Sequence, residues 1–338
     1  MNRKIRVGII GAGRMASKHI KAYKRLENVE IIGIAGRSEG KVSSLCEKSG
    51  VRKGYVDYKK LLSENELDVV SITTPAHTHC TIAIDCFLEG CHVLCEKPMA
   101  MNVNDAKEMN ESSKKADKLL MIGFNLRFTD SFREVKSIIG KGVLGEVRLA
   151  WFRGSGNIQE KEWYLNKETS GGVTLESSIH KIDWLRWIVG SEVVEVYCQT
   201  IEDVLGHGLN NNEFMTMRFK NGALGVIGSS YSFNVLPDDI GVIGSRRCIG
   251  VRNGKVVLRD FRKGNSIMDR LKSYIPDFNL ISDIKLLLND SINKEVKHFI
   301  GCVVANKKPI IDGDCGVKSM EIAEAAMKSA RTNKPVRL

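Results

Sequence analysis

Short runs of apolar, often β-branched residues alternate with amphipathic stretches over the first third of the chain. Such runs are typical of buried strands, and they occur at 5–10, 30–35, 54–56, 68–72, 92–95 and 119–123. The longer segments between them have the pattern of helices, at 19–26, 41–49, 78–89 and 103–118. Strands that alternate with helices of this length build right-handed βαβ units around a parallel sheet. We therefore predict a doubly wound α/β domain over residues 1–123.

The pattern changes after residue 123. Helices are predicted at 132–140 and 175–189, and the accompanying strands lie at 147–151, 193–199, 213–219, 223–229, 244–251 and 256–259. Asn221-Gly222 and Asn253-Gly254 separate neighbouring strands, and Asn-Gly is a strong hairpin signal. Closing helices are predicted at 292–306 and 316–332, whereas 262–290 shows no clear pattern. Residues 124–338 therefore predict an α+β domain with a large, mostly antiparallel open sheet, whose last helix is expected to pack back on the first domain.

Composition narrows the class of protein. A chain of 338 residues is long for one hydrophobic core, which favours two domains. The net charge of +11 comes from 51 basic residues scattered among 40 acidic ones, so we expect a lysine-rich solvated surface and no nucleic-acid partner; a positive field that favours small anionic ligands is the functional alternative. The nine cysteines lack CxxC spacing, which predicts no metal and a reduced, cytoplasmic protein. No run approaches the ~20 apolar residues of a membrane span, so no membrane partner is expected.

A glycine motif follows the first predicted strand. The run 11–16, Gly-Ala-Gly-Arg-Met-Ala, matches the pattern GxGxxG/A where the chain passes from a buried strand into a helix. Gly11 permits the tight turn, Gly13 lets a pyrophosphate approach the backbone, and Ala16 allows close packing of helix on strand. The N–H groups at a helix N-terminus favour phosphate. The first domain is therefore expected to be a Rossmann fold that binds a dinucleotide.

The end of the second predicted strand bears on which dinucleotide binds. In NAD-binding proteins an acidic residue at this place holds the 2′-hydroxyl of the adenosine ribose. Here the strand ends Ala35-Gly36-Arg37-Ser38, and the first carboxylate is Glu39. Arg37 and Ser38 can bind a 2′-phosphate, so the sequence favours NADP(H) over NAD(H). Arg37 can also stack on the adenine or remain solvated.

Two further segments carry residue types suited to catalysis. Lys97 belongs to a Glu-Lys-Pro run at the carboxyl end of a predicted parallel strand, which is the edge where ligands bind in open α/β sheets. Downstream of a double glycine, Glu176, His180 and Asp183 have i, i+4 and i+7 spacing on a predicted helix. This spacing predicts that the three side chains share one face of the helix.

With these motifs the chain resembles the Gfo/Idh/MocA family, which takes its name from glucose–fructose oxidoreductase, inositol dehydrogenase and a rhizopine catabolism protein. The likeness spans nearly the whole chain and includes, in order, the glycine motif, Thr74-Pro75 with His79, Glu96-Lys97-Pro98, 123–128, Gly171-Gly172 with His180, and 323–338. The resemblance implies that Lys97 and His180 flank the reacting carbon, with Glu176 where the family commonly has Asp. It also implies a homodimer or homotetramer, because the antiparallel sheets of this family often pair between subunits.

The residue types agree with the chemistry that the family implies. Oxidation of a secondary alcohol requires a base for the hydroxyl proton while hydride leaves, and histidine has a suitable pKa at neutral pH. We therefore expect His180 to be the base and Lys97 to stabilise negative charge on the oxygen. Glu176 is expected to orient the imidazole or bind a substrate hydroxyl. Substrate contacts are also expected from Asn125, Arg127, Trp163 and Asp183. Asp183 can instead secure its helix.

Cofactor contacts are expected at the glycine motif and the strand ends, from Gly11, Gly13, Arg14, Met15, Arg37, Ser38, Thr74, Pro75, His79, Glu96 and Lys97. His79 can alternatively pack the Thr-Pro turn; a metal-ligating role is disfavoured because no carboxylate or cysteine completes a ligand set. The leading hypothesis is an NAD(P)-dependent oxidoreductase acting on a secondary alcohol of a sugar, cyclitol or nucleotide-linked sugar. A cofactor-recycling glycoside hydrolase or epimerase of the same family and a non-catalytic NAD(P)-binding regulator remain open.

Overall fold

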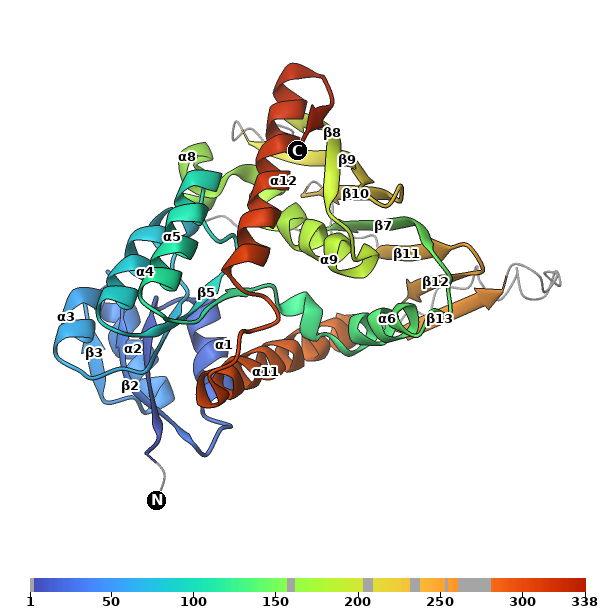
Figure 1. Ribbon diagram of the computed structural model, residues 1–338. Helices are drawn as coiled ribbons and strands as arrows, with labels where there is room; N and C mark the ends of the chain where they lie inside the picture. Colours follow the sequence, from blue (N-terminus) through green and yellow to red (C-terminus); the bar gives the residue numbers. More distant parts are fainter. Residues whose placement is uncertain (1–2, 157–161, 203–208, 232–237, 253–254, 261–280) are drawn as a thin grey trace. The chain divides into compact units, whose positions relative to one another are not determined.

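The computed structural model describes residues 3–156, 162–202, 209–231, 238–252, 255–260 and 281–338 (Figure 1). The chain divides into two compact units, each with its own β-sheet. The first unit comprises Met1–Asn125, Lys161–Gly171 and Ser291–Glu324, and the second comprises Leu126–Glu160, Gly172–Asp290 and Ala325–Leu338. The sequence pattern divides the chain between residues 123 and 124. It does not predict that Lys161–Gly171 and Ser291–Glu324 belong to the first unit. Among the described residues, no helix combines the length and apolar character needed to cross a membrane.

A six-stranded parallel sheet forms the centre of the first unit, with the strand order β3-β2-β1-β4-β5-β6. The strands are β1 (Ile5–Ile10), β2 (Val29–Ala35), β3 (Lys53–Tyr55), β4 (Val69–Ile72), β5 (His92–Glu96) and β6 (Leu120–Gly123). Every residue of β4 and β6 is buried, as expected for a sheet that is covered on both faces. The direction of the strand order reverses between β1 and β4, and ligands bind at such a switch point. The predicted Rossmann fold is confirmed.

The helices of this unit connect successive strands and then return to them from the end of the chain (Figure 1). The connecting elements are α1 (Arg14–Tyr23), α2 (Glu39–Ser49), α3 (Tyr58–Ser63), the 3₁₀ turn η1 (Ala76–Thr78), α4 (His79–Leu88) and α5 (Val103–Lys115). The later ones are α7 (Glu162–Leu165), α8 (Lys167–Ser170), α11 (Ile281–Ala305) and α12 (Gly313–Thr332), of which α11 and α12 extend beyond the unit. Helix α3 was not predicted, because six residues are too few to show a helical period.

The segment between α11 and α12 joins the edge of the parallel sheet. The backbone N–H of Ile122 donates to the carbonyl of Ile311 at 3.0 Å. Asp314, in the first turn of α12, accepts hydrogen bonds from Asn110 at 2.8 Å and from Lys114 at 2.6 Å. These contacts anchor the beginning of α12 in the first unit.

The second unit contains an eight-stranded sheet with the order β13-β12-β11-β7-β10-β9-β8-β14. Among the described strands, β10 and β7 are parallel and all other neighbours are antiparallel. The strands are β7 (Val147–Ser155), β8 (Val193–Glu202), β9 (Asn210–Phe219), β10 (Leu224–Ser230), β11 (Asp239–Gly244), β12 (Arg247–Arg252), β13 (Lys255–Asp260) and β14 (Val336–Arg337). The helical elements are the 3₁₀ turn η2 (Asn125–Phe128), α6 (Asp130–Gly140), the π-helix η3 (Thr174–Ser178) and α9 (Ile179–Val189). The predicted large, mostly antiparallel sheet is confirmed.

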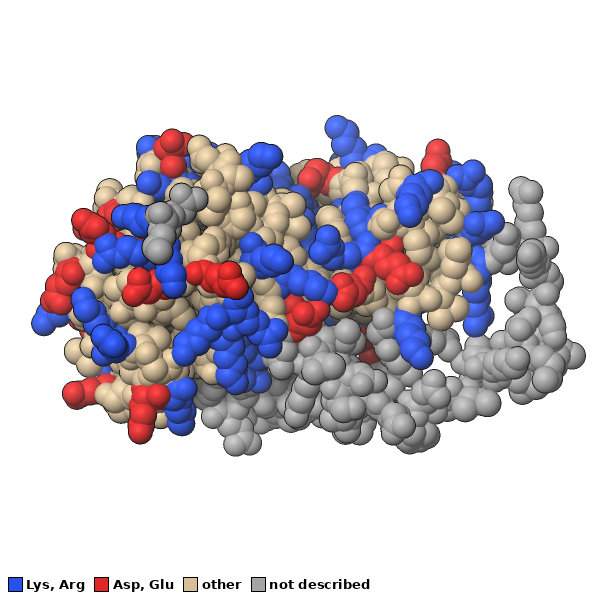
Figure 2. Space-filling view, turned by 90° about the horizontal axis from the view of Figure 1, so that it is seen from below, with Lys and Arg blue, Asp and Glu red and all other residues tan. Residues whose placement is uncertain are grey.

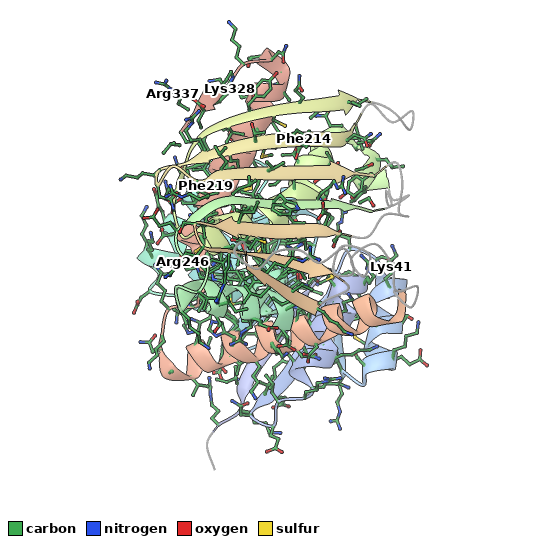
Figure 3. The ribbon with its side chains drawn as sticks, turned by 90° about the vertical axis from the view of Figure 1, so that its right-hand side faces the viewer. Lys41, Phe214, Phe219, Arg246, Lys328 and Arg337 are labelled. Atoms are coloured by element: carbon green, nitrogen blue, oxygen red, sulfur yellow. The ribbon has the colours of Figure 1, made fainter. Side chains whose placement is uncertain are left out.

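One face of this sheet carries the core and the other carries exposed side chains. Along β9, Phe214 is 55% exposed whereas Phe219 is 1% exposed, and both are labelled in Figure 3. On the covered face, Trp184 of α9 packs against Phe132 of α6 and Phe152 of β7, with ring centroids 5.3 and 5.5 Å away. This aromatic cluster fixes α9 on the sheet, and α9 carries several of the predicted site residues.

Two predicted elements of the second unit differ from the structure. The strand predicted at 244–251 is the end of β11, a turn and β12, and β11 itself was not predicted. Its glycines obscure the strand pattern: the ring of Trp151 occupies the space above Gly241, and a Cβ on Gly244 would lie 2.7 Å from the Cβ of Leu144. The helix predicted at 175–189 begins with the π-helix η3. The predicted Asn253-Gly254 turn lies outside the described residues.

The charged side chains are mixed in sign on the surface. Figure 2 shows Lys and Arg interspersed with Asp and Glu over one face of the described residues. Because charges of opposite sign lie next to one another, this face presents no continuous basic stripe of the kind that follows a nucleic-acid backbone.

Candidate active site

The turn after β1 has the geometry that a phosphate group requires. Gly11 has a φ of +115°, and a Cβ built on it would lie 2.8 Å from the carbonyl carbon of Thr73. A Cβ built on Gly13 meets no atom within 4 Å. Gly13 is the N-cap of α1, where no side-chain hydrogen bond caps the helix and no acidic residue occupies the first turn. The N–H groups at this helix end therefore border open space that fits the pyrophosphate of a dinucleotide.

The other residues predicted at this edge of the sheet flank the glycine turn. Arg14 and Met15 open α1, and Arg14 is exposed. Arg37 and Ser38 follow β2, whose last residue pairs with the last residue of β1, and both are exposed. Ser38 is the N-cap of α2, but its side chain makes no capping hydrogen bond. Both side chains are therefore accessible to a ligand at the carboxyl ends of β1 and β2.

His79 packs the turn after β4, which is the second of the two roles predicted for it. Its Nδ1 lies 2.9 Å from the carbonyl oxygen of Pro98, and its Nε2 lies 2.9 Å from that of Thr74. The ring is 1% exposed, and burial lowers its pKa although the two carbonyls oppose this. His79 therefore ties the Thr74-Pro75 turn to the segment after β5, and its ring nitrogens are used within the protein.

The Glu-Lys-Pro run lies at the carboxyl end of β5, next to β4 in the sheet. Glu96 is buried, and its Oε1 lies 2.9 Å from Nε2 of His19, while a cofactor contact by Glu96 stays a prediction. Lys97 is half-buried and is joined to Pro98 by a cis peptide bond. Because parallel strands end at one edge, Lys97 lies at the same edge of the sheet as the glycine turn.

In the second unit, a π-helix changes how Glu176, His180 and Asp183 are arranged around the helix axis. The backbone N–H of Ile179 donates to the carbonyl of Thr174, five residues earlier, so the turn that contains Glu176 is wider than an α-helical turn. The rule that places residues i and i+4 on one face does not hold across this turn. Glu176 and His180 are half-buried, whereas Asp183 is 1% exposed. Asp183 is therefore more deeply buried than the other two residues, and the convergence of all three on one face stays a prediction. π-helical turns are frequent at functional sites.

Asp183 and Arg127 form a buried ion pair. Arg127 Nε donates to Asp183 Oδ2 at 2.7 Å, and Nη2 donates to Oδ1 at 2.6 Å. The two side chains are 6% and 1% exposed. Burial raises the pKa of Asp183, and the Arg127 guanidinium opposes this rise. The pair joins η2 to α9, which is the helix-securing role predicted as the alternative for Asp183, and substrate contacts by Arg127 and Asp183 stay a prediction.

Replacement of Arg127 by alanine is expected to lower the free energy of unfolding by about 3–5 kcal/mol, because it leaves the Asp183 carboxylate buried without its partner. Urea denaturation followed by circular dichroism measures this change. Arg148→Ala is the matched control, since Arg148 pairs with Glu146 on the surface and its loss should cost less than about 1 kcal/mol. Equal costs for the two variants would contradict the structural role of the buried pair.

A buried polar network that the sequence did not predict holds η3 and α9 on the sheet. Lys181, next to His180, is 5% exposed and donates to the carbonyl oxygens of Gly154 and Gly228 at 3.0 Å and to Ser229 Oγ at 2.8 Å. Thr174 donates to the buried carboxylate of Glu213. Nothing in the sequence around Lys181 indicates that this side chain is buried. The network is therefore visible only in the folded structure.

Burial lowers the pKa of Lys181 to about 8, although the nearby Asp238 and Glu213 oppose this. In the unfolded chain a lysine titrates near pH ~10.4. Between these two values the unfolded chain binds a proton that the folded protein has lost, so stability rises with pH. We expect the free energy of unfolding of wild type, minus that of Lys181→Met, to increase by about 2 kcal/mol between pH ~8 and ~10. The exposed Lys220→Met is the control and should show no such trend; a flat difference for Lys181→Met would contradict the assignment.

The remaining predicted residues are placed as follows. Asn125 begins η2 and is half-buried. Trp163 lies in α7, and its side chain lies outside the described residues. Lys97 belongs to the first unit, and Glu176 and His180 belong to the second, so the approach of these side chains to one another stays a prediction.

The switch point of the parallel sheet, the open helix N-terminus at Gly13 and Lys97 at the same sheet edge are the features of a dinucleotide-binding Rossmann domain. The chain belongs to the Gfo/Idh/MocA family: residues 5–124 match the oxidoreductase family with an NAD-binding Rossmann fold, and residues 132–249 match the GFO/IDH/MocA C-terminal domain. The predicted family, the predicted enzyme class and a nicotinamide dinucleotide as cofactor are thereby confirmed.

Similar proteins cover the whole chain. Myo-inositol 2-dehydrogenase of Thermotoga maritima is 30% identical over 99% of this chain and 98% of its own length. The scyllo-inositol 2-dehydrogenase (NAD(+)) of Bacillus subtilis is 25% identical over 100% of this chain and 97% of its own. The fold is shared with the WlbA dehydrogenase from Bordetella pertussis, solved in complex with NADH and UDP-GlcNAcA, at a TM-score of 0.88 and 22% identity over 100% and 99% of the two chains.

Proposed function

We propose that the protein transfers hydride between a nicotinamide dinucleotide and a secondary alcohol carbon of a cyclitol or sugar. The observation that carries this proposal is the shared sheet edge in the first unit, where the open Gly13 cradle and Lys97 follow strands β1 and β5. The relatives named as inositol 2-dehydrogenases support a ring alcohol as the substrate class.

In the proposed mechanism, the bound dinucleotide supplies the hydride acceptor during alcohol oxidation. His180 takes the proton from the hydroxyl group while hydride leaves the carbon that carries this group. The alcohol loses one proton and one hydride and becomes a neutral ketone. The ammonium group of Lys97 stabilises the negative charge that develops on the oxygen. Glu176 orients the imidazole or binds a neighbouring hydroxyl. Arg127 and Asp183 act indirectly, because their ion pair holds α9, the helix that carries His180.

The choice between the two dinucleotides depends on the end of β2. Arg37 and Ser38 are exposed there, and no carboxylate precedes Glu39, which favours a 2′-phosphate and hence NADP(H). The names of the relatives favour NAD(H) instead, since one carries NAD(+) in its name and another was solved with NADH. Arg37 and Ser38 therefore predict a preference for NADP(H), which differs from the cofactor in the names of the relatives.

The test follows nicotinamide absorbance after the protein is mixed with NAD⁺ or NADP⁺ and a panel of inositols, glucosides and UDP-sugars. We expect reduction with at least one ring alcohol and a higher kcat/KM with NADP⁺. Arg37→Ala should lower kcat/KM for NADP⁺ about tenfold, because one charge-assisted hydrogen bond is lost. Arg25→Ala, an exposed arginine beyond the other end of α1, is the matched control.

Each other outcome of this assay has a distinct meaning. A strong NAD⁺ preference in the wild type would reject the role of Arg37 without affecting the dehydrogenase proposal. Product formation with retained dinucleotide and no net reduction would replace it by the cofactor-recycling alternative. Dinucleotide binding without turnover of any substrate would favour a regulator.

The predicted homodimer or homotetramer is supported by the open face of the eight-stranded sheet. Ile201, Phe214 and Leu224 lie on neighbouring strands and are 62%, 55% and 49% exposed. Apolar side chains at this exposure are stabilised when a second copy covers them. Sedimentation equilibrium is expected to give the mass of a dimer or tetramer.

A further inference from the structure

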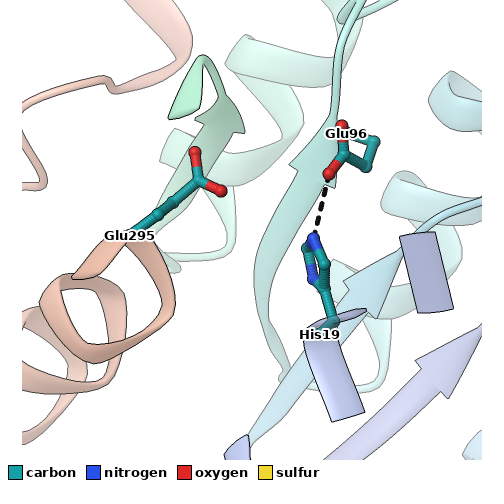
Figure 4. Close-up of side chains that lie close together, drawn as sticks. All are labelled: His19, Glu96 and Glu295. Atoms are coloured by element: carbon teal, nitrogen blue, oxygen red, sulfur yellow. Dashed lines mark hydrogen bonds and ion pairs between the residues drawn. The ribbon is translucent and has the colours of Figure 1, made fainter. Parts of the chain in front are cut away.

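A buried cluster of one histidine and two carboxylates lies inside the first unit (Figure 4). His19 comes from α1, Glu96 from the end of β5, and Glu295 from α11. The potential ligand atoms of the three side chains all lie within 4.8 Å of one another. The residues are 0%, 8% and 0% exposed, so the cluster is shielded from water by the helix pair and the sheet. The proposed hydride-transfer chemistry does not use it.

Glu295 requires a partner that the surrounding residues do not provide. Among the described residues, both of its carboxylate oxygens are buried without a hydrogen-bond partner. Figure 4 shows the carboxyl group directed toward Glu96 and His19. A buried carboxylate without a partner is costly, and a second carboxylate nearby increases that cost. Burial and the negative charge of Glu96 both raise the pKa of Glu295 well above its ordinary value. A positive group at this place would remove the cost.

The histidine is oriented as a metal-binding histidine is. Its Nδ1 lies 3.1 Å from Oγ of Ser71, which in turn lies 2.9 Å from the hydroxyl of Tyr23. Such a partner on one ring nitrogen fixes the ring and leaves the other nitrogen to bind a cation. The distance of 2.9 Å between His19 Nε2 and Glu96 Oε1 suits a hydrogen bond. It is also close to the separation of two neighbouring ligands of one cation, since bonds of about 2.0–2.2 Å place such atoms about 3 Å apart.

We propose that His19, Glu96 and Glu295 bind one divalent ion of the first-row transition series, such as Zn²⁺ or Mn²⁺. One imidazole and two carboxylates are ligands that these ions accept, and the two negative charges balance the charge of the ion. The ion joins α1, β5 and α11, so its role is to hold the returning helix on the Rossmann sheet. The site is separate from the proposed hydride transfer, and its presence or absence is measured without substrate.

The test measures metal content of the full-length protein, produced without a polyhistidine tag, by inductively coupled plasma mass spectrometry. About one ion per chain is expected in the wild type, and a chelator should lower Tm by about 5 °C, reversed by added Zn²⁺. Glu295→Gln keeps the side-chain shape but removes a ligand charge, so it should contain no stoichiometric metal and show no Zn²⁺-dependent change in Tm. Glu47→Gln, an exposed residue of α2, is the matched control and should retain both properties.

The competing explanation is that a proton neutralises Glu295 and no ion binds. In that case the wild type would contain no metal, added Zn²⁺ and Mn²⁺ would not change its Tm, and Glu295→Gln would be as stable as the wild type; this result overturns the proposal. If Glu295→Gln does not fold, the metal-depleted wild type is titrated with Co²⁺ and its visible absorption spectrum is recorded. A spectrum that saturates at one equivalent supports the site, and its absence overturns it.

Discussion

Lys97→Met and His180→Ala are each expected to lower kcat by about 100- to 10,000-fold while the dinucleotide still binds. His180 takes the hydroxyl proton in the proposed step, and Lys97 stabilises the oxygen from which that proton leaves. Neither side chain forms part of the glycine turn that holds the pyrophosphate, so the Kd of the dinucleotide should change far less than kcat, even though Lys97 is also a predicted cofactor contact. Steady-state kinetics on the alcohol substrate, with fluorescence titration of NADH or NADPH, measures both quantities.

Two variants serve as controls for this pair. His77→Ala removes an exposed histidine in η1, and Lys41→Met removes an exposed lysine in α2. Both should retain wild-type kcat. Near-wild-type turnover in Lys97→Met and in His180→Ala would contradict the proposed catalytic roles of these residues, even if the dinucleotide binds as proposed.

Gly13→Val is expected to weaken dinucleotide binding by about 10- to 100-fold and to leave the fold intact. The φ of Gly13 is −101°, which valine adopts, and a Cβ at this position touches no protein atom within 4 Å. The added methyl groups would instead occupy the space of the pyrophosphate, which costs about 1–3 kcal/mol when a close contact is overfilled. Calorimetric titration with the dinucleotide, together with the Tm of the unliganded protein, separates binding from stability.

Two further glycine variants serve as controls, one for dinucleotide binding and one for stability. Gly140→Val places a side chain at another glycine with no atom within 4 Å, at the end of α6 and not at the carboxyl edge of the parallel sheet, and should bind the dinucleotide normally. Gly11→Ala should lower Tm, because Gly11 has a φ of +115° and its new Cβ would contact the backbone of Thr73. If Gly13→Val binds as tightly as Gly140→Val, the dinucleotide does not lie on this turn.

The sequence predicts the first unit well because its signals are local. Buried runs such as 68–72 and the glycine motif at 11–16 each correspond to one strand or one turn, and the motif requires a strand before it and a helix after it. Strand β11 is the contrast. Its glycines have no side chains to show alternation, and the reason for Gly241 is Trp151, which lies 90 residues away and fills the space above it.

The roles of polar residues in the candidate site were harder to predict, because each depends on a distant partner. Asp183 fits an exposed helical face until Arg127 is found beside it. His79 suits a cofactor contact until Pro98 and Thr74 occupy both ring nitrogens. The π-helical turn before Ile179 leaves no mark in the periodicity, yet it changes the angle around the helix axis between Glu176 and His180. Spacing along the chain cannot supply these pairings.

The proposed site is tested by a crystal structure of the protein with bound dinucleotide. We expect the pyrophosphate against the backbone of Gly11 and Gly13, with the side chains of Lys97 and His180 both facing the reactive face of the nicotinamide. A structure in which these two side chains lie on separate surfaces, or in which the dinucleotide binds elsewhere, would contradict it.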